Sequence, residues 1–231
     1  MRPGFISYSV GQGERAKMLH FTTFFFLGCN ISTYNTCPMG KMVSNPDEDR
    51  ALVKAVVRGD HHALARLVDD HKALVGHMIQ RIIDQPEEVE EICQDVFLRV
   101  YEKLSTFQFQ SKLSTWIATI AYRTAINHVK QNKNVETVNL EALQLTLPVS
   151  DGQVEAQDFK RFVHYLIDQL PSTYRTLITL YYVEEFTYQE IETITGMPEG
   201  TVKNYLHRAK AKLRTIAKPF QHLEFNDYGK Q

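Results

Sequence analysis

The stretch FTYQEIETITGMPEGTVKNYLHRAKAKLR, residues 186–214, decides the fold of the C-terminal part of the chain. Thr187 and Glu190 have the spacing of a capping box, in which a threonine begins a helix and a glutamate three residues later bonds back to it. Gly196 can adopt the positive φ that ends a helix, and Pro198 suits the first turn of the next one. The stretch therefore predicts two short helices joined by a tight turn, which is the arrangement of a helix-turn-helix.

The second of these helices is predicted to bury one side and to expose a basic face. At about 100° per residue, the apolar side comprises Val202, Leu206, Ala209, Leu213 and Ile216. The opposite side holds Lys203, Asn204, His207, Arg208, Ala211 and Arg214, with Thr201 nearby. Asn, Arg and Lys can address base edges in the major groove, and Lys and Arg neutralise phosphates. The charge run alone also fits a solvated basic helix, but the capped first helix and the turn favour DNA binding.

Helical periodicity continues through the rest of the chain after residue 45, and no strand-like alternation persists, so the predicted fold class is all-α. Asp60 can cap a helix whose apolar stripe includes His71, and we interpret this histidine and its neighbours His61, His62 and His77 as core or surface residues rather than metal ligands. Pro86 can begin the next helix. Its predicted buried face is Val89, Ile92, Cys93, Val96, Phe97, Val100 and Leu104. The polar residues away from that face include Glu91, Gln94 and Asp95, which fit either a solvated surface or a docking site for a basic partner.

A polar loop, residues 105–112, leads into a third helix that Ser114 or Thr115 is expected to cap and that runs to about residue 133. One side of this helix carries Trp116, Thr119, Arg123, Asn127 and Lys130, and residues 112–133 contain no Asp or Glu. One aromatic ring with cations on a single face suits unstacked bases and their backbone. Trp116 itself is expected to fill the core, whereas the three polar residues nearer the end of the helix are the expected nucleic-acid contacts.

The composition changes after the third helix, where several acids occur without any Lys or Arg and Pro148 breaks any long element. We interpret residues 134–159 as a flexible acidic linker between two small helical domains, residues 42–133 and 160–218. Residues 219–231 form a short tail.

The first 41 residues show no clear period, and we interpret them as either a disordered extension or the product of a start codon assigned too far upstream. Residues 18–29, MLHFTTFFFLGC, are faintly similar to a lipoprotein signal, an interpretation that we do not favour. No apolar stretch is long enough to predict a transmembrane helix.

The three cysteines, Cys29, Cys37 and Cys93, form no CxxC pair. They indicate neither a disulfide framework nor a zinc site, and this suits a reducing cytosol. We therefore expect no metal and no cofactor.

Two segments resemble the extracytoplasmic-function (ECF) sigma factors of bacterial RNA polymerase. EEVEEICQDVFLRVYEKL (residues 87–104), followed by KLSTWIATIAYRTAINHVK (residues 112–130), is similar to the core-binding and −10-recognition regions of that family. Residues 186–213 are similar to its −35-recognition helix-turn-helix. The resemblance covers about residues 47–133 and 160–218. It implies a cytoplasmic, non-enzymatic subunit that binds core polymerase at its clamp and flap, directs it to promoter DNA and helps to open the strands.

The resemblance also implies roles for particular residues. The core-binding face is Glu91, Gln94 and Asp95; the −10 contacts are Phe107, Gln108, Lys112, Arg123, Asn127 and Lys130; and the −35 contacts are Thr201, Lys203, Asn204, His207 and Arg208. The chain departs from the family where many members carry Asn, here Arg123, and where many carry Asp, here Asn127. The preferred −10 sequence therefore does not follow from the resemblance. Many relatives are held by a membrane anti-sigma factor, which makes such a protein a possible partner of this one.

Two other functions remain open at this stage. A free-standing helix-turn-helix regulator would use the C-terminal half alone, usually as a symmetric dimer, and would leave residues 86–133 without a task. A nucleic-acid enzyme would need paired carboxylates, a Gly-rich phosphate loop or a nucleophile beside a base, and the sequence presents no such set. No small-molecule substrate is expected.

Overall fold

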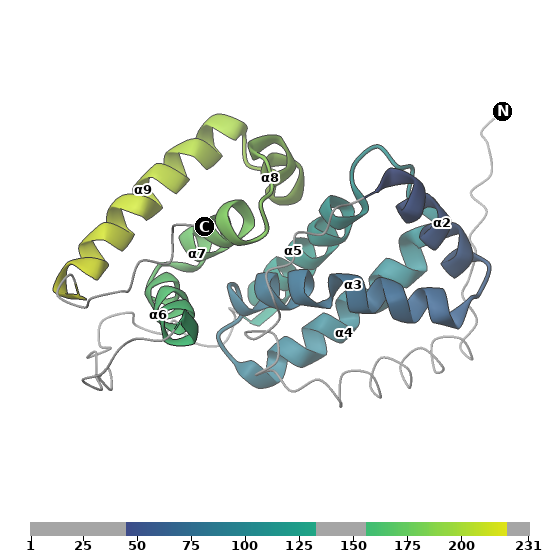
Figure 1. The fold of residues 1–231 in the computed structure, drawn as a ribbon, viewed down its shortest axis with the longest axis horizontal. Helices are drawn as coiled ribbons and strands as arrows, with labels where there is room; N and C mark the ends of the chain where they lie inside the picture. Colours follow the sequence, from purple (N-terminus) through teal and green to yellow (C-terminus); the bar gives the residue numbers. More distant parts are fainter. Residues whose placement is uncertain (1–44, 133–155, 221–231) are drawn as a thin grey trace. The chain divides into compact units, whose positions relative to one another are not determined.

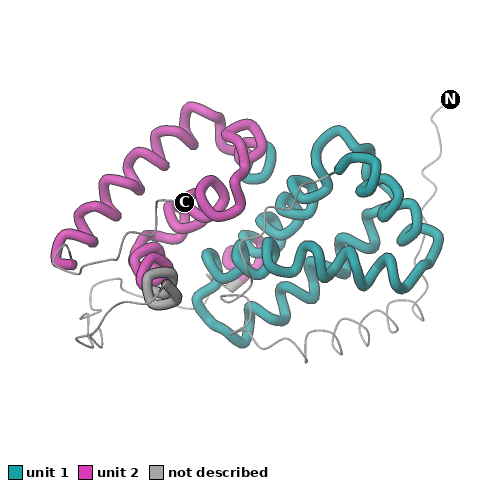
Figure 2. The backbone as a smooth tube through the Cα atoms, in the orientation of Figure 1, with its two compact units in different colours: residues 1–126, 193–195 teal, residues 127–192, 196–231 magenta. Residues whose placement is uncertain are grey.

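The computed structural model describes residues 45–132 and 156–220, and within these ranges it contains helices and no strand, which confirms the all-α prediction (Figure 1). The predictions for residues 1–41, for most of the acidic linker and for most of the tail lie outside the described residues. The chain divides into two compact units, residues 1–126 with 193–195 and residues 127–192 with 196–231 (Figure 2). The packing of each unit is considered by itself.

The first two helices of the first half, α2 and α3, begin where the side chains of Asn45 and Asp60 accept hydrogen bonds from free backbone N–H groups. The helices of this half are α2 (Pro46–Val57), α3 (His61–Gln80), α4 (Pro86–Lys103), the short η2 (Leu104–Thr106) and α5 (Leu113–Asn132). The Asp60 carboxylate accepts hydrogen bonds from the backbone N–H groups of His62, at 2.9 Å, and Ala63, at 3.2 Å, as predicted. Helix α4 begins at Pro86, also as predicted. Helix α2 is absent from the prediction because its apolar signal is short, with Val53 and Val56 buried.

The core of the first unit lies where α3 packs against α4, with α2 packed on α3 and on η2 (Figure 1). The predicted stripe of α4 is buried throughout, and Phe97 is 1% exposed. His71 is 4% exposed, and its Nδ1 donates to the Leu67 carbonyl oxygen at 2.9 Å. Burial lowers the pKa of His71 below its usual value, which agrees with a neutral core histidine. Burial likewise raises the pKa of the Cys93 thiol to about 12, so that this thiol stays protonated and unreactive.

The start of α5 differs from the prediction. The backbone N–H of Trp116 donates to the Lys112 carbonyl oxygen at 3.1 Å, so that Lys112 rather than Ser114 or Thr115 precedes the helix. Leu113 and Thr115 are both 1% exposed. Leu113 is the first residue of the helix, so Ser114 and Thr115 lie inside its first turn instead of capping it, and burial of Leu113 extends the helix toward the loop.

The second half contains α6 (Ala156–Asp168), α7 (Ser172–Ile178), the π-helical turn η3 (Thr179–Val183), α8 (Tyr188–Thr195), α9 (Glu199–Ala217) and η4 (Lys218–Phe220). Helix α7 packs against α9, and α6 packs against both of them. The break predicted at Pro171 lies between α6 and α7. Helix α6 begins at Ala156, ahead of the predicted domain start at residue 160, because neither Gly nor Pro occurs between Gly152 and Pro171.

Candidate nucleic-acid interface

The opening stretch folds into the predicted helix-turn-helix. The Thr187 hydroxyl accepts from the Glu190 backbone N–H at 3.3 Å, and the Glu190 carboxylate accepts from the Thr187 backbone N–H at 2.9 Å. These two bonds complete the capping box at the start of α8. The helix ends at Gly196, whose φ of 74° lies in the left-handed region that favours glycine. Pro198 then immediately precedes α9.

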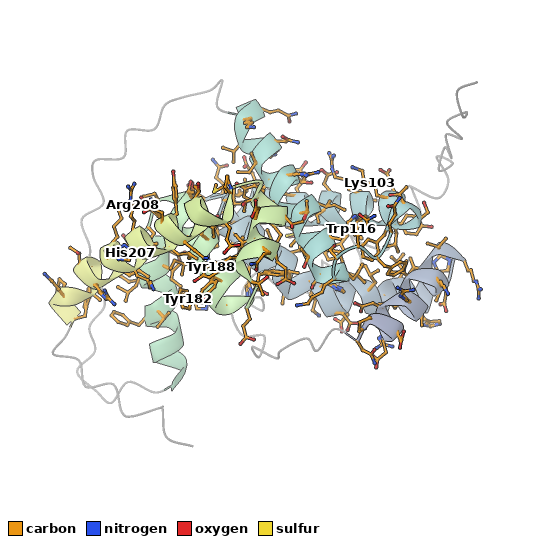
Figure 3. The ribbon with its side chains drawn as sticks, turned by 90° about the horizontal axis from the view of Figure 1, so that it is seen from above. Lys103, Trp116, Tyr182, Tyr188, His207 and Arg208 are labelled. Carbon is orange, nitrogen blue, oxygen red and sulfur yellow. The ribbon has the colours of Figure 1, made fainter. Side chains whose placement is uncertain are left out.

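Helix α9 has the two faces that its sequence predicts. Val202 and Ala209 are fully buried and Leu206 is 3% exposed, while Leu213 and Ile216 are half-buried. Four of the five candidate −35 contacts are exposed and Thr201 is half-buried. The exposed ones are Lys203, Asn204, His207 and Arg208 (Figure 3 labels the last two on α9). The exposed face therefore combines an amide, an imidazole and two cations on one rigid element, a set that can contact base edges and phosphates.

Lys203 differs from the other candidates because it is already engaged within the helix-turn-helix. Its Nζ lies 2.5 Å from Glu199 Oε1 and 5.1 Å from the centre of the Tyr188 ring. The Tyr188 ring in turn stacks on Tyr181, with ring centres 4.8 Å apart. The hydrogen bond with Tyr181 raises the pKa of the Tyr188 phenol, which keeps that phenol neutral. A phosphate that Lys203 contacted would therefore share its ammonium group with Glu199 or compete with that carboxylate for it.

Polar side chains of α8 also hold the start of α9. The Glu192 carboxylate accepts from the Glu199 backbone N–H at 3.2 Å, and the Gln189 amide donates to Glu199 Oε2 at 3.0 Å. A carboxylate suits the positive end of a helix that has no side-chain cap of its own. Gln189 and Glu192 are not among the contacts predicted from the sequence. Their spacing of three along α8 was an available signal, because residues three apart share a helix face.

We expect the substitution Thr187→Ala to lower the free energy of unfolding of the second unit by about 1 kcal/mol, since it removes the side-chain acceptor at the start of α8. Thermal unfolding followed by circular dichroism measures this loss. Thr173→Ala is the matched control, because Thr173 is an exposed threonine in the first turn of α7. An equal loss in both variants would show that the capping box contributes nothing particular.

The loop before α5 is built on three aromatic rings. Phe107 is 8% exposed, and its ring centre lies 4.6 Å from that of Phe109 and 5.0 Å from that of Trp116. Trp116 (labelled in Figure 3) was expected to fill the core, but it is only half-buried and packs against buried Phe107. Among the candidate −10 residues, Phe107 thus lies beneath the loop surface, whereas Gln108 and Lys112 are exposed. The buried Phe107 ring packs under the loop, so exposed Gln108 and Lys112 are the loop residues that can contact DNA.

Helix α5 presents the remaining candidate −10 residues as an exposed stripe. Arg123, Asn127 and Lys130 are exposed, and their spacing of four and three places them on one face. Ile117 and Ala121 are fully buried on the other side. The stripe brings two cations and an amide to the surface without an intervening acid.

The candidate polymerase-binding residues lie together on α4. Glu91 is exposed, and Gln94 and Asp95 are half-buried. Asp95 Oδ2 accepts from Arg99 Nε at 2.8 Å, with 44% of the Asp95 side chain exposed. The acidic surface therefore contains its own counter-charge one turn away, and a basic partner would compete with Arg99 for the carboxylate.

Within residues 45–132 and 156–220, no cluster of three potential ligands could hold a metal ion, and no helix is long and apolar enough to cross a membrane.

The described residues define an all-helical protein that carries a helix-turn-helix and two exposed polar surfaces. Residues 67–135 match the family described as Sigma-70 region 2, and residues 163–213 match the one described as Sigma-70, region 4. The ECF RNA polymerase sigma factor SigW of Bacillus subtilis (strain 168) is 32% identical over 173 residues, which are 70% of this chain and 92% of that relative. This chain belongs to the ECF sigma factor family.

Two solved structures have the same fold. CnrH, in complex with the cytosolic domain of CnrY, has a TM-score of 0.54 and 18% identity, covering 74% of this chain and 97% of that one. The sigma factor RpoE of Bartonella quintana, in complex with the anti-sigma factor NepR, has a TM-score of 0.50 and 22% identity, covering 67% of this chain and 96% of that one. Residues 86–133 lie within the match to region 2. A free-standing helix-turn-helix regulator would give these residues no role. The protein is therefore a sigma factor of promoter-specific transcription initiation, a class of initiation factors rather than enzymes.

Proposed function

We propose that residues 42–133 bind core RNA polymerase and the −10 element, and that residues 160–218 read the −35 element. Residues 134–159 link these two regions. The observation that carries the proposal is the exposed polar face of α9, which lies opposite buried Val202 and Leu206 in a capped helix-turn-helix. In this proposal α9 enters the major groove, as the second helix of such a motif does.

The proposed contacts in region 4 fall into two groups, those to base edges and those to phosphates. Asn204 and Arg208 can bond base edges, whereas Lys203 and His207 are better suited to the phosphate backbone. Thr201, half-buried at the first turn of α9, can bond a phosphate near the helix N-terminus. Because Lys203 is shared with Glu199 and Tyr188, it contributes less to affinity than an exposed lysine without such contacts.

The proposed contacts in region 2 bind a single DNA strand of the opened promoter. Gln108 and Lys112 lie on the loop, and Arg123, Asn127 and Lys130 follow along α5. Cations track the backbone of an unpaired strand, and amides can bond bases whose edges are no longer paired. Phe107 belongs to this site as the buried support of the loop.

The partners proposed for this chain are core RNA polymerase, through its clamp and flap, and promoter DNA. The B. quintana sigma factor is in complex with an anti-sigma factor, and we propose a membrane anti-sigma factor as a further partner of this chain. The protein acts in the cytoplasm, where polymerase and chromosome meet. It performs no catalysis of its own and needs no cofactor, no metal and no small-molecule substrate.

Reconstitution with bacterial core RNA polymerase tests this function directly. We expect run-off transcription on a genomic fragment library, followed by sequencing of the transcripts, to give discrete start sites that share two upstream elements. Protein without core enzyme is the control, and it should bind the same fragments weakly. A folded protein that supports no core-dependent initiation would overturn the proposal.

We expect Asp95→Arg to weaken binding to core polymerase by about tenfold, because it reverses a half-exposed charge on the proposed docking face and places it beside Arg99. Fluorescence anisotropy with labelled protein measures the affinity. Asp69→Arg is the matched control, since Asp69 is an exposed aspartate on α3 paired with nearby Lys72. Equal affinities for Asp95→Arg and the wild type would remove α4 from the polymerase interface.

A further inference from the structure

The loop before α5 contains a residue in an unfavourable backbone conformation. Phe109 has a φ of 56°, in the left-handed region that a bulky side chain seldom adopts. Such a residue keeps this conformation only when its surroundings hold it, and residues of this kind gather at functional sites. The question is which contacts hold Phe109.

Two contacts fix the Phe109 ring, and one of them comes from a distant part of the sequence. The ring centre lies 4.6 Å from that of buried Phe107, which anchors it from below. The guanidinium carbon of Arg50 lies 5.1 Å from the Phe109 ring centre, within the range of a cation–π contact. Arg50 is an exposed residue of α2, and α2 packs on η2, the short helix that leads into the loop.

Anchoring this ring sets the direction of the side chains beside it. Gln108 and Gln110 flank Phe109 in the chain, both are exposed, and the Gln110 amide donates to Gln108 Oε1 at 3.1 Å. An amide carries both donors and an acceptor, the groups that bond a base edge. With Phe109 held, the two amides are presented together at the loop surface.

We propose that Arg50 is a positioning residue for promoter recognition: through its contact with Phe109 it holds the loop in the conformation that presents Gln108 and Gln110 to an unpaired base of the promoter. This inference rests on the proposed function of the loop and deepens it. It makes α2 a determinant of −10 selectivity without any contact between Arg50 and DNA.

The test compares two promoters that differ by one unpaired base of the −10 element, both taken from the run-off experiment. The rate of open-complex formation is measured with full-length protein in the holoenzyme, and the ratio of the two rates gives the selectivity. We expect Arg50→Ala to lower this ratio by about two- to fivefold, as the loss of a partly exposed cation–π contact implies. Arg58→Ala, an exposed arginine at the end of the same helix, should leave the ratio unchanged.

A double-mutant cycle separates positioning from other effects. Phe109→Leu keeps the bulk of the side chain but removes the ring face, so that adding Arg50→Ala should produce no further loss. The dependence of promoter binding on salt should keep its slope in Arg50→Ala, because no phosphate contact is lost. Affinity for core polymerase and the melting temperature should also match the wild type.

Three results would overturn the inference: additive losses in the cycle, a salt slope lowered by about one, or wild-type selectivity in Arg50→Ala. Each of them requires a wild-type holoenzyme that initiates from the two promoters. If the wild-type holoenzyme does not initiate, it is the proposed function that fails, and the two failures are therefore distinguishable.

Discussion

Replacing Phe97 by alanine is expected to lower the free energy of unfolding of the first unit by about 3–5 kcal/mol. Phe97 is 1% exposed on α4, and it belongs to the core that α3 and α4 share. Truncating such a ring loses the transfer free energy of its carbons and leaves a cavity that the surrounding helices fill in part. Small domains have about 5–15 kcal/mol of total stability, so this one substitution removes a large share of it.

Urea unfolding followed by circular dichroism measures the effect as a shift of the midpoint at unchanged slope. Lys103→Ala, on the same helix with its side chain exposed, is the matched control and should change stability by less than about 0.5 kcal/mol. Because α4 also carries Asp95, binding to core polymerase should weaken in Phe97→Ala as the temperature approaches its lowered midpoint. A loss in Phe97→Ala no larger than that of the control would mean that the α3–α4 core tolerates the cavity.

Local signals in the sequence predicted the ends of several helices correctly. Asp60, the Thr187–Glu190 box and Gly196 each act through backbone groups within a few residues, so their effect does not depend on the rest of the fold. The buried faces of α4 and α9 were predictable for a similar reason, since helical geometry alone fixes which residues share a side. Burial of the opposite face then left the polar residues of α9 exposed.

Contacts between elements could not be predicted in this way. The pairing of Lys203 with Tyr188 depends on the angle between α8 and α9, which periodicity does not contain. Phe107 was expected at the DNA surface, but its burial depends on Trp116 and Phe109 meeting it from other directions. The contact of Arg50 with Phe109 joins α2 to the loop before α5 through the packing of α2 on η2. Such contacts require the three-dimensional structure.

Arg208→Ala is expected to reduce promoter-specific initiation by about ten- to a hundredfold, which corresponds to about 1–3 kcal/mol for a side chain that contacts a base or phosphate. Arg208 is exposed on α9, on the side opposite buried Leu206. Its truncation leaves the core of the second unit untouched, so the melting temperature should stay within about 2 °C of the wild type. Run-off transcription at several salt concentrations measures the loss and its salt dependence.

The same experiment distinguishes the two contacts that Arg208 can make. If its guanidinium meets a phosphate, the salt slope falls by about one in Arg208→Ala and is restored in Arg208→Lys, because lysine keeps the charge. If it bonds a guanine edge in the bidentate way, Arg208→Lys remains impaired and the loss is confined to promoters with that base. Lys210→Ala is the comparison, since Lys210 is an exposed cation on the same helix that is not among the proposed −35 contacts. Equal losses for Arg208→Ala and Lys210→Ala would mean that α9 attracts DNA by charge alone and that its exposed face does not read the −35 element.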